Sequence, residues 1–163
     1  MQYSDTSTLD PATEQLLKQV LHYAKQKGIT LEKIQSLYTE EGEQTVPLAA
    51  FASELSPSEG LCKYLKDHYD LTYAQIAALL NRDDRSIWTS INRAEKKHPG
   101  PFNPDSDIRI PVKIFADRSH SILEHVIIYL QEHFGYTIYK IAKLLNKKPS
   151  ALYAIAKRGH AKE

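Results

Sequence analysis

Basic, amide and hydroxyl side chains gather in two short segments of the sequence, residues 82–96 and 147–158, and their types suit contacts with nucleic acid. The guanidinium of Arg85 and the amide of Asn92 have the chemistry to bind the edges of guanine and adenine, respectively. Most of the other cations suit phosphate groups, which position a protein without reading base sequence. The remaining candidate contacts are Arg82, Ser86, Thr89, Arg93 and Lys96 in the first segment, and Lys147, Lys148, Ser150, Tyr153, Lys157 and Arg158 in the second.

Both segments belong to an internal repeat. Residues 56–93, the first repeat, align with residues 121–158, the second repeat, at a constant offset of 65 and without a gap. Upstream, residues 46–51 match residues 110–115 at an offset of 64. A repeat near this length indicates a duplicated supersecondary unit. Identical pairs include Glu59/Glu124, Tyr64/Tyr129, Leu65/Leu130, His68/His133, Thr72/Thr137, Ile76/Ile141, Ala77/Ala142, Leu80/Leu145, Asn81/Asn146 and Arg93/Arg158.

Apolar periodicity and capping residues predict three helices in each repeat. Thr72 can cap the second helix of the first repeat, and Gln75 can complete a capping box there. Asn81 follows that helix and tolerates the left-handed conformation that a tight turn demands. The expected helices cover residues 58–69, 73–80 and 84–96 in the first repeat, and 121–134, 138–145 and 149–158 in the second.

The spacing of Ala77, Asn81 and Ile87 is typical of a helix-turn-helix. A small residue lets the third helix cross closely over the second, a turn residue follows four positions later, and an apolar anchor follows ten positions later. This geometry leaves one side of the third helix free to enter a major groove.

The string LTYAQIAALLNRDDRSIWTSINRA resembles the helix-turn-helix of bacterial sigma-factor region four, of related transcription regulators and of transposase DNA-binding domains. The resemblance covers residues 72–95 and, more weakly, residues 137–158. It implies a trihelical fold and DNA binding. The matching residues are Thr72, Gln75, Ile76, Ala77, Leu80, Ser86, Ile87, Arg93 and Ala94.

Two features depart from this family pattern. Asn81 replaces the usual turn glycine, and Asp83 and Asp84 open the expected third helix of the first repeat. A carboxylate beside phosphates weakens binding, although Asp84 could accept a hydrogen bond from cytosine. The second repeat has Lys148 and Pro149 instead, so we expect it to hold the DNA backbone more strongly and the first repeat to be more selective.

The chain before the repeats predicts a helical hairpin. Asp10 and Pro11 form a helix start, Leu16, Leu17, Val20, Leu21 and Ala24 mark one apolar face, and Gly28 ends the helix before Thr30 caps a second one. No segment alternates as a strand would, so the expected fold is all-α, with tandem trihelical helix-turn-helix bundles after the hairpin. The expected divisions are 1–45 for the hairpin and its acidic linker, 46–97, a Pro/Gly linker at 98–109, and 110–163.

Composition narrows the function classes. Residues 1–60 carry nine acidic and four basic groups, whereas residues 61–163 carry eleven and seventeen, so the C-terminal part favours polyanions. No apolar run approaches the roughly 18 residues needed to span a bilayer, and the N-terminus lacks a secretory pattern. A single cysteine, Cys62, fits a reducing, cytoplasmic setting.

The sequence predicts no catalytic residues, no cofactor and no metal ligands. His68 and His133 are equivalent, but neither has a histidine or carboxylate three or four residues on, so packing or capping roles are expected. No nucleophile elbow and no glycine-rich phosphate loop accompanies the serines and histidines. We therefore expect a protein that is not an enzyme.

The leading hypothesis is a sequence-specific protein that binds double-stranded DNA through two helix-turn-helix modules. It would be a transcription regulator or a phage or mobile-element factor, monomeric or homodimeric, with RNA polymerase or another protein as a further partner and the nucleoid as its location. The alternative is a protein-interaction adaptor that uses residues 40–59 and the apolar helix 121–134. RNA binding is a third possibility, but A-form grooves admit a recognition helix poorly.

Overall fold

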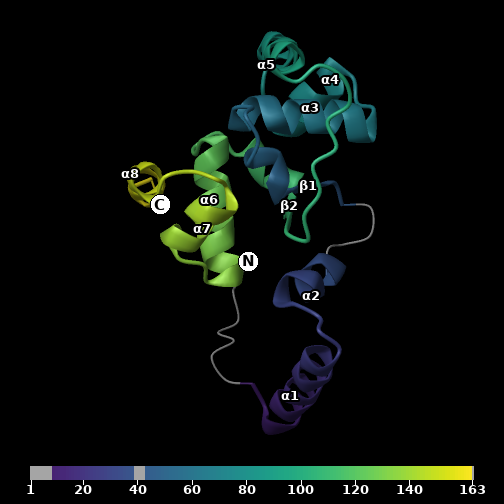
Figure 1. Ribbon diagram of the computed structural model, residues 1–163, viewed down its shortest axis with the longest axis vertical. Helices are drawn as coiled ribbons and strands as arrows, with labels where there is room; N and C mark the ends of the chain where they lie inside the picture. Colours follow the sequence, from purple (N-terminus) through teal and green to yellow (C-terminus); the bar gives the residue numbers. More distant parts are fainter. Residues whose placement is uncertain (1–8, 39–42, 163) are drawn as a thin grey trace. The chain divides into compact units, whose positions relative to one another are not determined.

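The computed structural model of the protein describes residues 9–38 and 43–162, and for residues 35–38 it describes the backbone. The described residues fall into two compact units, 9–38 and 43–162. Both units are mainly helical, and one two-stranded sheet lies in the second unit (Figure 1). The prediction of the all-α class is confirmed at this level. None of the described helices combines the length and apolar character needed to cross a bilayer.

The first unit contains two helices, α1 (Pro11–Gln26) and α2 (Leu31–Tyr38). Asp10 caps α1 by accepting a hydrogen bond from the Thr13 amide at 3.0 Å, and Thr30 accepts one from the Lys33 amide at 3.2 Å, as the sequence predicts. Gly28 between the helices has a φ of +68°, which glycine adopts without strain. The predicted apolar face of α1 is 45–60% exposed at its four large positions, and Ala24 alone among the α1 residues is buried.

The first repeat folds into α3 (Pro57–Tyr69), α4 (Tyr73–Leu80) and α5 (Asp84–Lys97), which pack on one another. A capping box joins Thr72 and Gln75 at the start of α4, as predicted. Asn81 ends α4 in the left-handed conformation, with a φ of 53°. The small side chain of Ala77 is buried where α4 meets α5, and the buried core there includes Ile76, Ala77, Leu80, Ile87, Ile91 and Ala94.

The second repeat folds in the same way into α6 (Ile122–Phe134), α7 (Ile138–Leu144) and α8 (Pro149–His160). Asn146 repeats the left-handed turn with a φ of 54°, and Thr137 caps α7 by accepting from the Lys140 amide at 3.2 Å. Pro149 occupies the first turn of α8, where its missing amide proton is not needed. The predicted helix bounds therefore hold to within about two residues at each end.

The absence of strands was the wrong part of the fold prediction. Strand β1 (Thr45–Pro47) pairs antiparallel with β2 (Arg109–Pro111), and each leads into a short 3-10 helix, η1 (Leu48–Phe51) or η2 (Val112–Ala116). Strands of three residues are too short to show an alternating pattern, and their partners lie more than sixty residues apart. The expected linker 98–109 consequently ends inside β2, and its Phe102 is buried in the core.

The two strands of this small sheet, which precede the two repeats, are related by a local two-fold axis. Val46 lies opposite Ile110 in the ladder, and these are equivalent positions of the repeat. Two equivalent residues that face each other across antiparallel strands lie about a dyad, because exchanging the strands leaves the pair unchanged. The equivalent rings of Phe51 and Phe115 also meet, with centroids 5.9 Å apart. The symmetry is approximate, because some contacts between the repeats depart from it. One such contact is the packing of η2, which precedes the second repeat, on α4 of the first, where the Asn81 side-chain amide donates to the Ala116 carbonyl at 3.2 Å.

Arg109 fastens the sheet to the first repeat. Its guanidinium donates to the hydroxyl of Thr45 and to the hydroxyl of Tyr64, each at 2.8 Å. The hydroxyl of Tyr69 accepts a hydrogen bond from the Thr45 amide and donates one to the Thr45 carbonyl, both at 3.0 Å. These contacts hold residues from both repeats in one unit.

Candidate nucleic-acid interface

The outward face of α5 carries most of the first group of predicted contacts. Ile87, Ile91 and Ala94 face the core. Successive residues of a helix are rotated by about 100°, so residues spaced three or four apart form a second stripe on the opposite side. Arg85, Arg93 and Lys96 are exposed, whereas Thr89 and Asn92 are half-buried. The structure therefore brings together Arg85, Thr89, Asn92 and Lys96 in one stripe, with Arg93 beside it.

Two hydroxyls on α5 are already used within the helix. Ser86 donates its hydroxyl proton to Asp83 at 3.0 Å, and its amide donates to the same carboxylate at 2.8 Å. The hydroxyl of Thr89 donates to the Arg85 carbonyl at 2.8 Å. Both hydroxyls keep lone pairs that can accept, but their protons are engaged. Arg85 and Asn92 are thus the donors on this stripe best suited to base edges.

Asp83 keeps a negative charge at the start of α5. The hydrogen bonds from the backbone amide and then the hydroxyl of Ser86 lower the pKa of this exposed carboxyl below its ordinary value. The group is therefore ionised at neutral pH. As a cap it stabilises the helix, and as a charge it opposes phosphate at the same end.

The outward face of α8 carries two small side chains and one lysine. Leu152, Ala156 and Gly159 are buried, which leaves Ser150, Ala154 and Lys157 on the opposite side. Lys148 at the start of this helix is exposed, and Lys147 is half-buried with its amide bonded to the Ala142 carbonyl at 2.9 Å. Within the part of the chain that the structure describes, Lys147, Lys148 and Lys157 form no ion pair.

One large aromatic side chain stands beside each outward face. Trp88 on α5 is 53% exposed and Tyr153 on α8 is 59% exposed, at equivalent positions of the repeat. Rings of this size gain by burial, so each offers a stacking or packing surface next to the cations.

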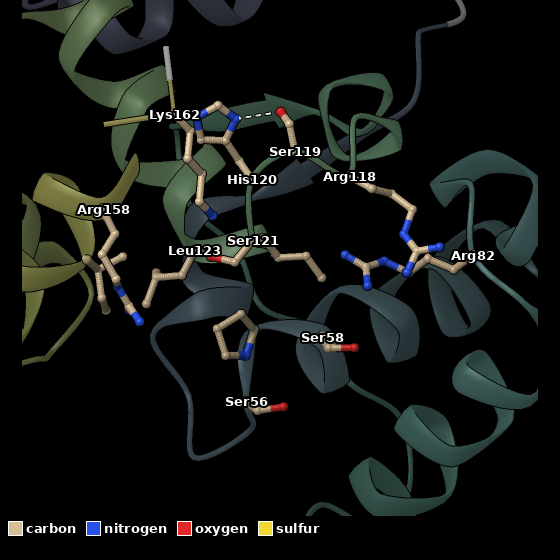
Figure 2. A pocket seen from close by; sticks show the side chains of 13 residues that line it. Ser56, Ser58, Arg82, Arg118, Ser119, His120, Ser121, Leu123, Arg158 and Lys162 are labelled. Carbon is tan, nitrogen blue, oxygen red and sulfur yellow. Dashed lines mark hydrogen bonds between the residues drawn. The ribbon is translucent and has the colours of Figure 1, made fainter. Parts of the chain in front are cut away.

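Two of the predicted contacts face away from the outward stripes. Arg82, in the turn before α5, and Arg158, on a flank of α8, both line a pocket between the two repeats, and Figure 2 shows them on opposite sides of it. The pocket measures about 540 Å³ and also contains Arg118 and Lys162, which the sequence did not single out. Arg118 lies in an irregular segment, so helical periodicity gave no signal for it.

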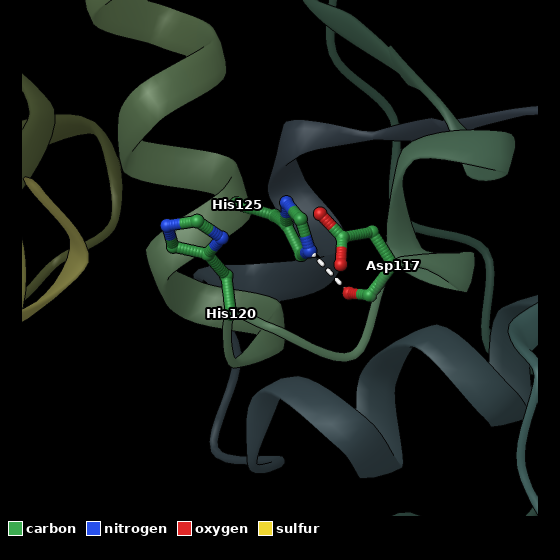
Figure 3. Close-up of side chains that lie close together, drawn as sticks. All are labelled: Asp117, His120 and His125. Atoms are coloured by element: carbon green, nitrogen blue, oxygen red, sulfur yellow. Dashed lines mark hydrogen bonds between the residues drawn. The ribbon is translucent and has the colours of Figure 1, made fainter. Parts of the chain in front are cut away.

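Asp117, His120 and His125 are the described residues best placed to hold a metal ion, because one potential ligand atom from each lies within 4.8 Å of the others (Figure 3). Hydrogen bonds already tie these groups to the backbone. His125 donates from Nε2 to the Asp117 carbonyl at 2.7 Å, and His120 donates from Nε2 to the Gly159 carbonyl at 3.0 Å. The amide of Ser119 holds the Asp117 carboxylate at 2.9 Å. These contacts fasten α8 to the segment that precedes α6.

Cys62 is the one cysteine of the chain, and it is buried in the core of the first repeat. Burial raises the pKa of its thiol to about 11, so the thiol stays protonated at neutral pH. A nucleophilic or metal-binding cysteine requires the thiolate form. Cys62 therefore behaves as a small apolar side chain.

No protein-family model, curated protein or solved structure matches the chain. The function must therefore be inferred from the chemistry of the exposed side chains. The predicted contacts fall into three groups: the stripe on α5, the stripe on α8 with its preceding turn, and the pair Arg82 and Arg158 at the pocket.

Proposed function

We propose that the protein binds double-stranded DNA through two helix-turn-helix modules in which α5 and α8 are the recognition helices. In this interpretation α3–α5 and α6–α8 are tandem trihelical bundles. The observation that carries the proposal is the side of each third helix opposite its buried face, which carries Arg85, Asn92 and Lys96 on α5 and Lys157 on α8. An outward third helix of this kind is the element that enters a major groove in such modules.

One of the three acidic residues on or capping α5, Glu95, is already engaged in an ion pair within the protein. Glu95 is ion-paired with the buried ammonium of Lys63 at 2.6 Å, and Lys63 also contacts Asp67 at 3.1 Å. Only the first turn, with Asp83 and Asp84, places carboxylates near the expected DNA. This favours different roles for the two helices. The lysines of α8 would contact phosphates, and Arg85 and Asn92 of α5 would select the base sequence.

The local dyad favours an inverted arrangement of the two recognition helices. When protein modules are related by a two-fold axis, the DNA half-sites that they read mirror that symmetry. Linking both modules in one chain also raises their effective concentration for each other, so modest affinity of each suffices. A regulator of transcription or a phage or mobile-element factor, working at the nucleoid, fits such a protein.

One observation favours a second candidate for the first unit. Leu16, Leu17, Val20 and Leu21 form an exposed apolar face on α1, and such faces typically mark contacts with other proteins. By contrast, α6 offers little apolar surface, since Ile122, Val126, Ile127 and Leu130 are buried inside the second unit. An adaptor function would therefore use α1, and it is compatible with DNA binding by the second unit.

A salt titration of binding to mixed-sequence duplex DNA tests the proposal. The logarithm of the affinity should fall linearly with the logarithm of the salt concentration, and changing Lys147 and Lys148 to alanine should make the slope shallower by roughly one to two units. If no binding is detected at about 50 mM salt, where non-specific contacts are usually measurable, the DNA proposal fails.

A further inference from the structure

The pocket between the repeats is built by four separate segments. The start of α3 contributes Ser56 and Ser58, the turn before α5 contributes Arg82, and residues 118–123 form a third side. One flank of α8 and the residues after it contribute Ile155, Arg158 and Lys162 (Figure 2). Because both repeats supply walls, a group bound here can contact both of them at once.

All the permanently charged side chains that line this pocket are cationic. They are Arg82, Arg118, Arg158 and Lys162, and the lining contains no aspartate or glutamate. Lys162 is partly neutralised by Glu124 behind it, at 2.8 Å. In the region that the structure describes, no ion pair is formed by Arg82, Arg118 or Arg158. Like charges that converge on one cavity repel one another, and a bound anion relieves that repulsion.

Arg82 adds a hydrogen-bond donor that lacks an acceptor. Its Nε atom is buried and has no hydrogen-bond partner among the described residues. A buried polar atom left unpaired is unfavourable, and in native proteins such atoms usually find an acceptor. Arg82 and Arg118 both line the pocket, and Figure 2 shows their side chains on the same side of the view, opposite Arg158.

The neutral groups in the pocket suit a ligand in which an oxyanion is attached to a partly apolar molecule. Helices α3 and α6 both begin at its wall, but the capping-box carboxylates of Glu59 and Glu124 already neutralise their N-termini, so the arginines supply the positive charge of the pocket. The apolar side chains Ile122, Leu123 and Ile155 lie among the cations. Planar guanidinium groups match the oxygens of a phosphate better than a single point charge does.

We propose that this pocket binds a phosphate group, supplied either by a free nucleotide-type ligand or by the backbone of bound nucleic acid. The volume of about 540 Å³ accommodates a group of that size together with part of the attached molecule. Since both repeats contact the anion, binding would also fix the two repeats more firmly relative to each other.

The test uses the full chain and compares Arg118→Gln with Arg85→Gln. Arg118 is exposed and lines the pocket, whereas Arg85 is exposed on the outward stripe of α5 and does not line it. Each change removes one arginine charge, and neither removes a buried contact, so both variants should fold. Binding of pyrophosphate and of ATP is measured by calorimetry, and binding of a mixed-sequence duplex by fluorescence anisotropy.

If a free ligand occupies the pocket, pyrophosphate or ATP binds the unaltered protein, and Arg118→Gln weakens that binding about tenfold or more while Arg85→Gln does not. If the DNA backbone occupies it, both free anions fail to bind and Arg118→Gln weakens duplex binding about tenfold. The proposal is overturned if Arg118→Gln changes neither measurement. If the protein binds pyrophosphate but not duplex DNA, the DNA-binding proposal fails and the pocket proposal stands. The two proposals can therefore be rejected separately.

Discussion

The ammonium of Lys97 donates to both carboxylate oxygens of Glu59, at 3.0 and 2.8 Å, and so ties the end of α5 to the start of α3. The second repeat makes the equivalent contact, from Lys162 to Glu124 at 2.8 Å. Each glutamate is also the capping-box partner of Ser56 or Ser121. Both repeats thus contain an ion pair that ties the end of the third helix, or the residues just after it, to the start of the first.

Replacing Glu59 by glutamine should destabilise the protein. The carboxylate is nearly fully buried and accepts from the Ser56 amide as well as from Lys97, so the change weakens two charge-assisted contacts. We expect the free energy of unfolding in urea to fall by about 1–3 kcal/mol. Lys97→Met should also be destabilising, because it leaves the buried Glu59 carboxylate without its cation. A Glu59→Gln protein as stable as the unaltered one would contradict this role.

Stability should decrease in acid through the same two glutamates. Burial raises the pKa of Glu59 and of Glu124, but the hydrogen bonds from Lys97 or Lys162 and from the serine amides outweigh it, so each folded pKa lies below the ordinary 4.5. A carboxyl group whose pKa is lower in the folded protein than in the unfolded chain stabilises the fold at pH values above its unfolded pKa. This stabilisation is lost as the pH falls through the folded pKa. Urea midpoints should therefore drop below about pH 4.5.

A double variant supplies the control for that pH dependence. With Glu59→Gln and Glu124→Gln combined, the decline of the urea midpoint between about pH 5 and pH 3 should become shallower. An unchanged decline would assign the acid sensitivity to other carboxyls, such as Asp83 and Asp117, whose pKa values are also lowered by hydrogen bonds from Ser86 and Ser119.

Asp83→Asn should strengthen DNA binding. Asparagine keeps a side-chain oxygen that can accept from the Ser86 amide, so α5 keeps its cap, while the negative charge near the expected phosphates disappears. We expect the affinity for a mixed-sequence duplex to rise several-fold at low salt, with little change in thermal stability. Weaker binding by a folded Asp83→Asn protein would show that this carboxylate contributes to recognition.

Selection of binding sites from random duplexes should yield two half-sites in inverted orientation. The pairing of Val46 with Ile110 places the strands that precede the two repeats about a local dyad, and we expect the recognition helices to follow it, since half-site symmetry follows module symmetry. The two halves should differ in sequence, because Arg85 and Asn92 have Ser150 and Lys157 as their equivalents. Enrichment of directly repeated half-sites would contradict the predicted orientation.

Removing metal ions should leave DNA binding unchanged. The Asp117, His120 and His125 side chains are held by hydrogen bonds, and none lies on the outward stripes of α5 or α8. Dialysis against a chelator should therefore alter neither duplex affinity nor the thermal unfolding midpoint. A lower midpoint that zinc restores would instead identify this cluster as a structural metal site.

The helices were predictable because their ends are set locally. The capping boxes, the left-handed Asn81 and the proline at the start of α8 act within four residues, so the sequence displays them directly. The inward and outward sides of α5 follow from the same periodicity. Sequence reasoning therefore recovered both stripes of the candidate interface.

Features that depend on distant segments were missed. The β1–β2 pair joins strands of three residues, and the pocket brings Arg118 to Arg82 and to Arg158 from different elements. No pattern within a short stretch of sequence predicts contacts between segments so far apart in the chain. The apolar face of α1 was predicted correctly as a pattern, but the two helices of that unit leave it exposed.

The most direct measurement compares duplex binding by two triple variants at about 50 mM salt. One changes Arg85, Arg93 and Lys157 on the outward faces to glutamine, and the other changes Lys18, Lys66 and Lys143 elsewhere to glutamine. With α5 and α8 as recognition helices, the first variant should lose at least about a hundredfold in affinity and have a shallower salt slope, while the second stays within a few-fold. Equal losses in both variants would mean that net charge alone attracts DNA, and would contradict recognition by these two helices.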